Sequence, residues 1–254
     1  MLKKDELPRC TDCDRIPRRC LCEFRPKSSL DLDSYLNRQR FKVYVIQSVS
    51  ERDHYKNSST FLKFLVKDYH KIVISLPSHH IESSLQSEQW QQINTLLEAE
   101  LNHDHRKVLL HPSPPQKLIA KTNAPNLSSV PNCKAESMSN FILLDMTWGH
   151  SKRLLAQSPF LSHITRFALD LKVIRAIQTQ LYNEYKSSKE AQNSQGNLKY
   201  STIRSGKRKP TEINSFESVL YTLIDSNLMS LKQTWPIWTE YQRWLQKLSH
   251  KRHF

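Results

Sequence analysis

An unbroken apolar run at residues 141–144 ends at an acid, Asp145, and this junction constrains the fold more than any other stretch of the chain. Four residues are too few to cross a membrane. A short apolar run of this kind is typical of a strand buried on both faces of a parallel sheet. After Trp148, the pair Leu154 and Leu155 fits the spacing of a helix. We therefore expect Asp145 where a central strand ends and a helix is about to begin.

This position makes Asp145 a candidate site residue. Open α/β sheets bind ligands beyond the carboxyl ends of their strands, and a helix that starts there directs backbone N–H groups at the ligand. The plainer interpretation is a helix start, in which Asp145 or Thr147 caps the helix and Trp148 packs in the core. The junction by itself leaves both interpretations open.

The rest of the chain repeats this alternation of strand and helix. Apolar runs at 41–46, 71–76 and 107–110 predict three more strands, and residues 83–100 have the apolar face of a helix. The spacing predicts an α/β fold with a mostly parallel sheet and flanking helices. An aromatic stripe at 235–245 is interpreted as core and not as a base-stacking surface.

Four of the five cysteines lie within thirteen residues, as Cys10-x-x-Cys13 and Cys20-x-Cys22. Thiols this close in a reducing compartment favour a structural zinc site with four thiolates, with buried or redox-active thiols as the alternative. Four arginines that could face an RNA backbone lie among them: Arg9, Arg15, Arg18 and Arg19. We therefore divide the chain into a small N-terminal zinc knuckle with its connector, residues 1–40, and an α/β domain, residues 41–254, which is the part expected to carry any catalytic activity.

The charge balance predicts a polyanionic partner. Lys and Arg number 38 against 24 Asp and Glu, a net charge of +14, which favours nucleic acid ahead of an anionic membrane. No stretch resembles a signal peptide or a spanning helix, so we expect a cytoplasmic protein without membrane contact. The three glycines form no glycine-rich loop, which disfavours a Rossmann dinucleotide site or a P-loop.

The residues from Asp145 to Trp148, followed by Arg153 and by a Ser-Pro-Phe-Leu string at 158–161, resemble the signature of the DTW-domain proteins, which are tRNA-uridine aminocarboxypropyltransferases. The N-terminal cysteines are similar to a zinc-type cluster of that family. A third block matches at Glu51, Lys56, Ser58 and Thr60, although Ser59 stands where Asn is usual. A fourth block matches at Tyr200, Arg204, Ser215 and Glu217, where Ser215 replaces the more usual Thr.

The resemblance implies transfer of the 3-amino-3-carboxypropyl group of S-adenosylmethionine to the ring imide nitrogen of a uridine in tRNA. It also implies a SPOUT-like fold with a knotted cofactor loop. The imide is a poor nucleophile until a base removes its proton, and a carboxylate near the target nitrogen fits that task. We expect Asp145 to be this base, with Glu51 as the alternative.

Further roles are expected by position. The predicted cofactor-binding residues are Thr147, Trp148, His111, Pro112, Ser215 and Glu217. The predicted RNA-binding residues are Lys56, Arg153, Arg204, Lys207 and Arg208. Plainer interpretations stay open, because Glu217 in a first helical turn can complement the helix dipole and most charge runs lie in solvated loops.

Two other functions fit parts of the sequence. A SPOUT-type RNA methyltransferase would share the fold and S-adenosylmethionine. A non-catalytic zinc-knuckle RNA-binding protein would explain the charge and the cysteines, with Asp145 and Glu217 as helix caps, but it leaves the Asp-x-Thr-Trp block unexplained. The expected partner is tRNA, and no protein partner can be identified.

Overall fold

The computed structural model describes residues 8–27, 36, 41–52, 54, 57–77, 83–101, 107–110, 140–167, 169–187 and 214–250. Within them, five parallel strands form one sheet in the order β2-β1-β4-β3-β5. The strands are β1 (Lys42–Ser48), β2 (Asp68–Ile74), β3 (Lys107–Leu110), β4 (Asn140–Asp145) and β5 (Thr165–Phe167). The predicted α/β fold with a parallel sheet is thereby confirmed.

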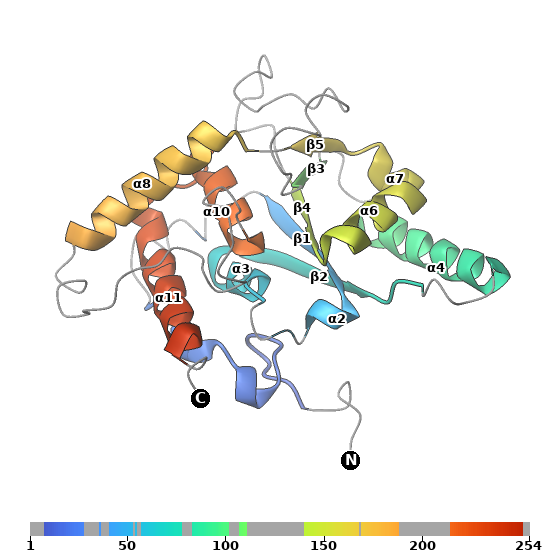
Figure 1. Ribbon diagram of the computed structural model, residues 1–254, viewed down its shortest axis with the longest axis horizontal. Helices are drawn as coiled ribbons and strands as arrows, with labels where there is room; N and C mark the ends of the chain where they lie inside the picture. The colour runs from blue at the N-terminus through green and yellow to red at the C-terminus, as the bar shows by residue number, and fades with distance from the viewer. Residues whose placement is uncertain are drawn as a thin grey trace.

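Helices cover both faces of this sheet (Figure 1). On one side lie α3 (Leu62–Leu65), α8 (Leu171–Ser187), α10 (Ser215–Asp225) and α11 (Leu231–His250). On the other side lie α4 (Ser83–Leu101), α6 (Trp148–Gln157) and α7 (Pro159–Ser162). The short helix α2 (Val49–Arg52) follows β1 directly, and a 3-10 turn, η4 (Ser59–Phe61), precedes α3.

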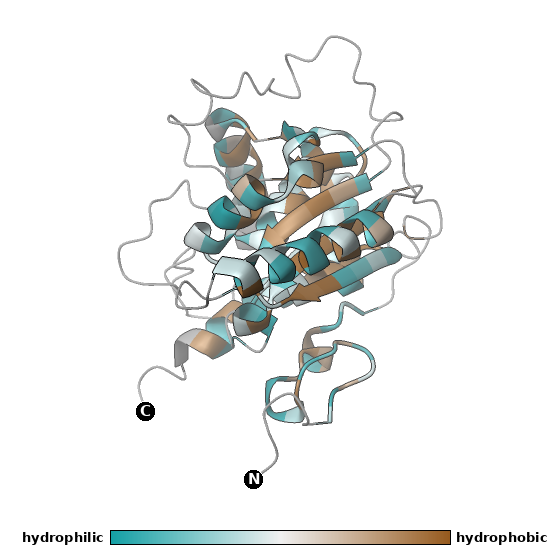
Figure 2. Cartoon of the chain, turned by 90° about the vertical axis from the view of Figure 1, so that its right-hand side faces the viewer, coloured by the Kyte–Doolittle hydropathy of each residue, from teal (hydrophilic) through white to brown (hydrophobic). Residues whose placement is uncertain are grey.

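The two cores follow from the alternation of side chains along each strand. Val43 and Phe141 point to the α10 and α11 side, whereas Tyr44 and Ile142 point to the α4 side. β4, which pairs on both edges, is buried along its whole length. Figure 2 shows strands that are largely hydrophobic beside helices in which hydrophilic and hydrophobic residues are mixed.

The second strand begins earlier than its apolar run predicts. The run predicts a strand at 71–76, whereas β2 spans Asp68–Ile74. The reason is that β2 is an edge strand whose first half alternates, with Asp68 and His70 exposed and Tyr69 turned inward. An alternating segment does not register as an unbroken apolar run.

The aromatic stripe near the C-terminus is core, as predicted. Trp238, Tyr241 and Trp244 of α11 are all buried in the apolar cluster between this helix and the sheet. Phe61 of η4 packs against this stripe, with its ring centroid 5.5 Å from that of Tyr241 and 5.2 Å from that of Trp244. α11 thereby closes one side of the molecule.

The cysteine segment, residues 8–27, contains two 3-10 turns, η2 (Pro17–Arg19) and η3 (Cys22–Phe24). Its buried residues Cys13, Leu21 and Phe24 belong to the same apolar cluster as β1, β4 and α11. None of the described helices is long and apolar enough to cross a membrane.

Candidate active site and metal site

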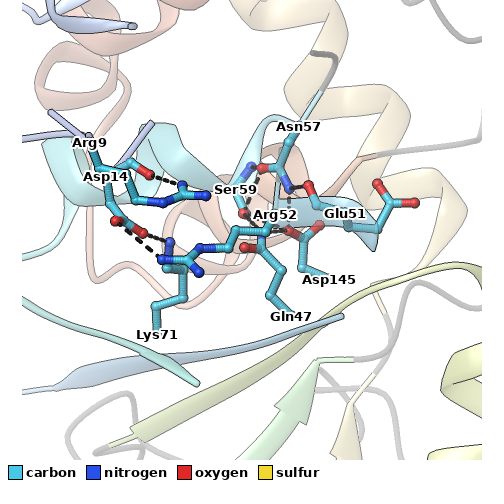
Figure 3. A network of polar contacts seen from close by, with 9 residues as sticks. All are labelled: Arg9, Asp14, Gln47, Glu51, Arg52, Asn57, Ser59, Lys71 and Asp145. Carbon is cyan, nitrogen blue, oxygen red and sulfur yellow. Dashed lines mark hydrogen bonds and ion pairs between the residues drawn. The ribbon is translucent and has the colours of Figure 1, made fainter. Parts of the chain in front are cut away.

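Asp145 lies at the carboxyl end of β4, in register with Gln47 at the carboxyl end of β1. Four side-chain groups lie within hydrogen-bonding distance of its carboxylate, and Figure 3 shows three of them, from Gln47, Asn57 and Ser59. Oδ2 is approached by Gln47 Nε2 at 2.6 Å, Asn57 Nδ2 at 2.6 Å and Ser59 Oγ at 2.7 Å, and Oδ1 by Ser215 Oγ at 2.8 Å. Asp145 therefore joins β1, the segment after α2, β4 and the start of α10.

This carboxylate is almost fully enclosed, with 3% of Asp145 exposed. Burying an isolated charge is costly, and several donors are what makes a buried carboxylate tolerable. The expectation from the sequence was an acid open to a ligand. The structure places Asp145 at the end of the expected strand but surrounds it with protein donors.

Asn57 and Ser59 form a small network of their own. The Ser59 backbone N–H donates to Asn57 Oδ1 at 3.0 Å, and Asn57 Nδ2 also donates to the Glu51 carbonyl at 3.1 Å. Ser59 Oγ lies 2.8 Å from Asn57 Oδ1 as well as 2.7 Å from Asp145 Oδ2, so its one hydrogen serves one acceptor at a time. Ser59, which stands where the DTW-like string usually has Asn, therefore still contacts Asp145, and Asn57 supplies an amide beside it.

Two buried oxygens at this site have no hydrogen-bond partner among the described residues. One is Glu51 Oε2 on α2 and the other is Gln47 Oε1. Gln47 is 2% exposed and Glu51 is half-buried. Figure 3 shows the Glu51 carboxylate directed away from the donors that surround Asp145. Both oxygens can accept a hydrogen bond from a bound molecule, and the Glu51 carboxylate can also accept a proton.

The cations near Asp145 come from β2, from α2 and from the cysteine segment. Lys71 of β2 forms an ion pair with Asp14, and Arg52 lies 3.8 Å from the other Asp14 oxygen. Burial lowers the pKa of Lys71 to about 8; Arg9 adds to this lowering and Asp145 opposes it. Burial also raises the pKa of Tyr69, and the negative charge of Asp145 raises it further.

The residues after Asp145 start α6. Thr147 is the N-cap of that helix, its Oγ1 accepting from the His150 N–H at 3.4 Å, as the plainer interpretation predicts. Trp148 is half-buried, and Lys152 Nζ lies 5.7 Å from the centre of its ring. Thr147 and Trp148 thus lie next to Asp145, at the end of the sheet where α/β proteins bind ligands.

Arg153 is engaged with protein groups. Its guanidinium donates to the Pro77 carbonyl at 2.7 Å and lies 5.6 Å from the centre of the Trp90 ring. These contacts fasten α6 to the segment after β2 and to α4. Its predicted contact with RNA is not tested by this arrangement.

Ser215 and Glu217 both lie in the first turn of α10. Ser215 reaches Asp145, whereas Glu217 completes a capping box with Asn214: Glu217 Oε2 accepts from the Asn214 N–H at 2.9 Å, and Asn214 Oδ1 accepts from the Glu217 N–H at 3.0 Å. Glu217 is 2% exposed. The structure therefore gives Glu217 a role in starting the helix.

The other predicted contact residues lie outside the described residues. They are His111, Pro112, Lys56, Arg204, Lys207 and Arg208.

The four predicted metal ligands come together. The sulfur atoms of Cys10, Cys13, Cys20 and Cys22 all lie within 4.8 Å of one another. Cys10 Sγ is 3.4 Å from Cys22 Sγ, and Cys13 Sγ is 3.7 Å from Cys20 Sγ. A tetrahedral zinc site with Zn–S bonds of about 2.3 Å has sulfur–sulfur edges of about 3.8 Å. The cluster therefore fits a zinc ion and could hold one.

The thiols of this cluster differ in their surroundings. The backbone N–H of Cys13 and the thiol of Cys22 lower the pKa of Cys10 to about 7, whereas burial raises the pKa of Cys13 and of Cys22. The turn between Cys10 and Arg15 is closed by two backbone hydrogen bonds, and Asp14 within it has φ 55°. A tight turn of this kind brings the first two thiols together.

Arg15 connects the cysteine cluster to the Asp145 site. Its side chain is 2% exposed and donates to two backbone carbonyls, that of His54 at 2.8 Å and that of Asn57 at 3.4 Å. Asn57 in turn donates to Asp145. The cysteine segment is therefore fastened to the same short stretch of chain that surrounds the carboxylate.

Sequence reasoning missed four residues of this arrangement, namely Gln47, Asn57, Ser59 as a partner of Asp145, and Arg15. One signal could have found Gln47: it ends the apolar run of β1 just as Asp145 ends that of β4, and parallel strands finish at one edge. Nothing in the local sequence distinguishes the buried Arg15 from the exposed Arg18.

The fold and this site define an α/β protein that joins a parallel sheet, with an acid at a central strand end, to a four-cysteine cluster. The family described as the DTW domain matches residues 7–208, which is most of the chain. The chain belongs to the DTW domain family, which is associated with tRNA-modifying aminocarboxypropyl transfer. Searches of curated proteins and of solved structures give no significant match.

The matched range ends before α10 and α11. Ser215, which contacts Asp145, and the aromatic stripe of α11 therefore come from the part of this chain beyond the family match.

Proposed function

We propose that this protein transfers the 3-amino-3-carboxypropyl group of S-adenosylmethionine to the ring imide nitrogen of a uridine in tRNA. The observation that carries the proposal is the Asp-x-Thr-Trp block of a DTW-family chain at the carboxyl end of a central parallel strand. Ligands of α/β sheets bind at that edge. The finer features implied by the family resemblance, a SPOUT-like fold with a knotted cofactor loop, are part of this proposal.

The chemistry requires one proton transfer and one substitution. A base takes the imide proton, and the nitrogen then attacks the aminocarboxypropyl carbon bonded to the sulfonium. The C–N bond forms as the C–S bond breaks, and the electron pair stays on sulfur, leaving methylthioadenosine. Because a sulfonium has three electrophilic carbons, the choice among them depends on how the donor is oriented.

Two carboxylates were expected to compete for the role of base, and their surroundings favour Glu51. Asp145 is approached by four protein groups, whereas Glu51 Oε2 has no partner among the described residues. We therefore assign proton removal to Glu51. Asp145 holds Gln47, Asn57 and Ser59 in place around the substrate.

The contacts with the donor are proposed for residues near this edge. Thr147 and Trp148 follow Asp145 directly and line its approach, and Ser215 fixes the start of α10 against it. Gln47 Oε1 offers a further acceptor. His111, Pro112 and Glu217 stay predicted cofactor contacts, and Lys56, Arg153, Arg204, Lys207 and Arg208 stay predicted RNA contacts. The four-cysteine cluster holds a structural zinc ion.

The test uses two forms of S-adenosylmethionine, labelled in the carboxypropyl carbons or in the methyl group, each incubated with the protein and bulk tRNA. We expect only the carboxypropyl label to enter RNA. Methyl label in RNA would identify a methyltransferase. Tight binding of tRNA with neither label transferred would identify a non-catalytic RNA-binding protein.

The base assignment is tested with Glu51→Gln. Since a positioned general base contributes roughly 100-fold to 10,000-fold, we expect kcat to fall by at least about 100-fold. Glu98→Gln on the exposed face of α4 is the matched control and should leave the rate unchanged. Full activity of Glu51→Gln would return the role to Asp145.

A further inference from the structure

A cavity of about 480 Å³ opens between the cysteine segment and the C-terminal half of α11. One wall comes from the cysteine segment, between Arg15 and Phe24, and the other from Trp244, Lys247 and Leu248. Its size is that of a small-ligand site. Asp145 and its four partners do not line it, so this cavity is distinct from the proposed active site.

The floor of the cavity is apolar, and two cationic side chains lie beside its aromatic ring Phe24. Leu21, Phe24 and Trp244 are buried lining residues. The Phe24 ring lies 5.1 Å from Arg243 Cζ and 5.4 Å from Lys247 Nζ. Arg243 also donates to the Glu23 carbonyl, and Lys247 Nζ lies 2.5 Å from Glu23 Oε1. These contacts hold the two walls together.

The rim of the cavity is positively charged. Arg18 is exposed, Arg19 is half-buried, and Lys247 has 47% of its side chain exposed. Among the described residues that line the cavity, Glu23 is the only acid. An apolar floor inside a cationic rim suits a planar base whose flanking phosphates carry negative charge.

We propose that this cavity binds one unpaired nucleotide of the RNA substrate. Its base lies against Leu21, Phe24 and Leu248, and its flanking phosphates contact Arg18 and Arg19. The choice of tRNA as the source rests on the proposed function. The net charge of +14 and the membership of a tRNA-acting family favour RNA over an acidic protein.

One residue, Arg15, connects the cavity to the proposed active site. Arg15 lines the cavity and donates to the carbonyl of Asn57, a partner of Asp145. RNA bound in the cavity is therefore held by a segment that is fastened to the active site. Because α11 follows the family-matched range, half of this binding site comes from the part of the chain beyond the match.

The rim is tested by Arg18→Glu combined with Arg19→Glu, with tRNA affinity measured without S-adenosylmethionine at several salt concentrations. We expect Kd to rise at least about 10-fold and the salt slope to fall by about 2, because two phosphates are no longer neutralised. The control combines Lys172→Glu with Arg175→Glu on α8, two exposed cations with the same change of charge. Equally weakened binding in both double variants would overturn the proposal, since it would show a general charge effect.

The floor is tested by Leu248→Trp, which fills the cavity without changing charge. We expect weaker binding with an unchanged salt slope, and loss of crosslinks from 4-thiouridine-substituted tRNA to residues 17–24 and 244–248. Leu96→Trp, at an exposed leucine of α4, is the matched control. Metal content and thermal unfolding verify that each variant folds. Crosslinks that fall elsewhere, or that survive Leu248→Trp, would overturn the proposal.

These outcomes separate the cavity from the proposed reaction. If neither label is transferred but tRNA binding depends on Arg18 and Arg19, the proposed reaction is wrong and the binding site stands. If transfer occurs and both cavity variants bind tRNA normally, the binding site is wrong and the reaction stands. Arg18- and Arg19-dependent binding of a polyglutamate peptide, with no such dependence for tRNA, would identify an acidic protein as the occupant instead.

Discussion

At the scale of single residues, the buried carboxylate of Asp145 is the centre of the structure around the site. Its charge is compatible with 3% exposure because Gln47, Asn57, Ser59 and Ser215 surround it. Removing the carboxylate would leave these donors buried without their shared acceptor. The free energy of unfolding should therefore fall when a single atom of this hydrogen-bonding arrangement is changed.

We expect Asp145→Asn to lower the free energy of unfolding by about 3 kcal/mol, because it keeps one acceptor oxygen and turns an N–H group toward existing donors. Ser215→Ala removes a single hydrogen bond and should cost about 1 kcal/mol. Denaturant unfolding of both variants measures the difference. Wild-type stability of Asp145→Asn would show that the four hydrogen bonds are not important for folding.

A second residue makes the stability depend on pH. Asp225 is the last residue of α10, where a negative charge opposes the helix dipole. Burial raises the pKa of Asp225 and the nearby Asp170 raises it further. Because this pKa is higher in the folded state than in the unfolded state, the contribution of Asp225 is most favourable at low pH and is lost as pH rises through the folded value.

We therefore expect Asp225→Asn to stabilise the protein at pH 7 by about 0.5 to 1 kcal/mol. The gain should shrink as pH falls, because the wild-type carboxyl becomes protonated at a higher pH in the folded state than in the unfolded state. Urea unfolding at pH 7, 5 and 4 measures this, with Glu184→Gln on the exposed face of α8 as the control. A gain that is the same at every pH would contradict the assigned cause.

The residues of the site differ in how far the sequence predicts them. Asp145 at a strand end and Thr147 as a helix cap follow from local pattern, because the apolar run and the residues after it are adjacent in sequence. The donors to Asp145 come from 70 to 98 positions away. Such partners depend on strand order and packing, which one sequence without relatives does not specify.

At the scale of elements, the cysteine segment supports the edge of the sheet at which Asp145 lies. Arg15 binds two carbonyls in the stretch after α2, and Asp14 pairs with Lys71 on β2. A buried guanidinium that donates to backbone carbonyls fixes the position of that backbone. Order in residues 57–59 should therefore depend on Arg15.

We expect Arg15→Ala to accelerate amide hydrogen exchange in residues 57–59 by about 10-fold to 100-fold, since hydrogen bonds to a charged group contribute about 1.5 to 3 kcal/mol. The Ser59 amide, which donates to Asn57 Oδ1, is the most direct probe. Arg18→Ala, at the exposed arginine of the same segment, is the control. Unchanged exchange in Arg15→Ala would show that the cysteine segment does not order this stretch.

The elements themselves were largely predictable. Helix α4, expected at 83–100, spans Ser83–Leu101, because its apolar residues recur at helical spacing over five turns. The edge strands were harder, since β2 begins with an alternating half and β5 has only three residues. Weak periodicity over a few residues gives a poor estimate of where a strand begins.

At the scale of the whole molecule, the cysteine segment shares the core of the sheet. Cys13, Leu21 and Phe24 pack in one apolar cluster with β1, β4 and α11. The division at residue 40 stays a prediction, but this packing means that loss of metal should affect more than the first 27 residues. Metal binding and global stability should be linked.

We expect about one zinc ion per chain, and chelation should lower the unfolding midpoint by about 6 to 12 °C, the shift that corresponds to roughly 3 kcal/mol for a domain of this size. Cys13→Ser should reproduce this destabilisation. Cys133→Ser, which changes the one cysteine that is distant from the cluster in sequence, is the control. A metal-free protein with an unchanged midpoint would contradict the zinc assignment.

The order of the strands could not be derived from the sequence. Alternating strands and helices predict a parallel sheet, but β2-β1-β4-β3-β5 is one of several orders that right-handed connections permit. The order that occurs puts β4 between β1 and β3, so that Asp145 lies next to Gln47.

The contacts of Glu23 with Arg243 and Lys247 join residues 220 and 224 positions apart. During synthesis on the ribosome, the cysteines leave the exit tunnel long before α11 is made. A nascent chain can therefore gather its thiols early, yet the second wall of the cavity beside them is missing until α11 has been made. Any RNA-binding activity of that cavity would begin only after α11 has been synthesised and has folded against the cysteine segment.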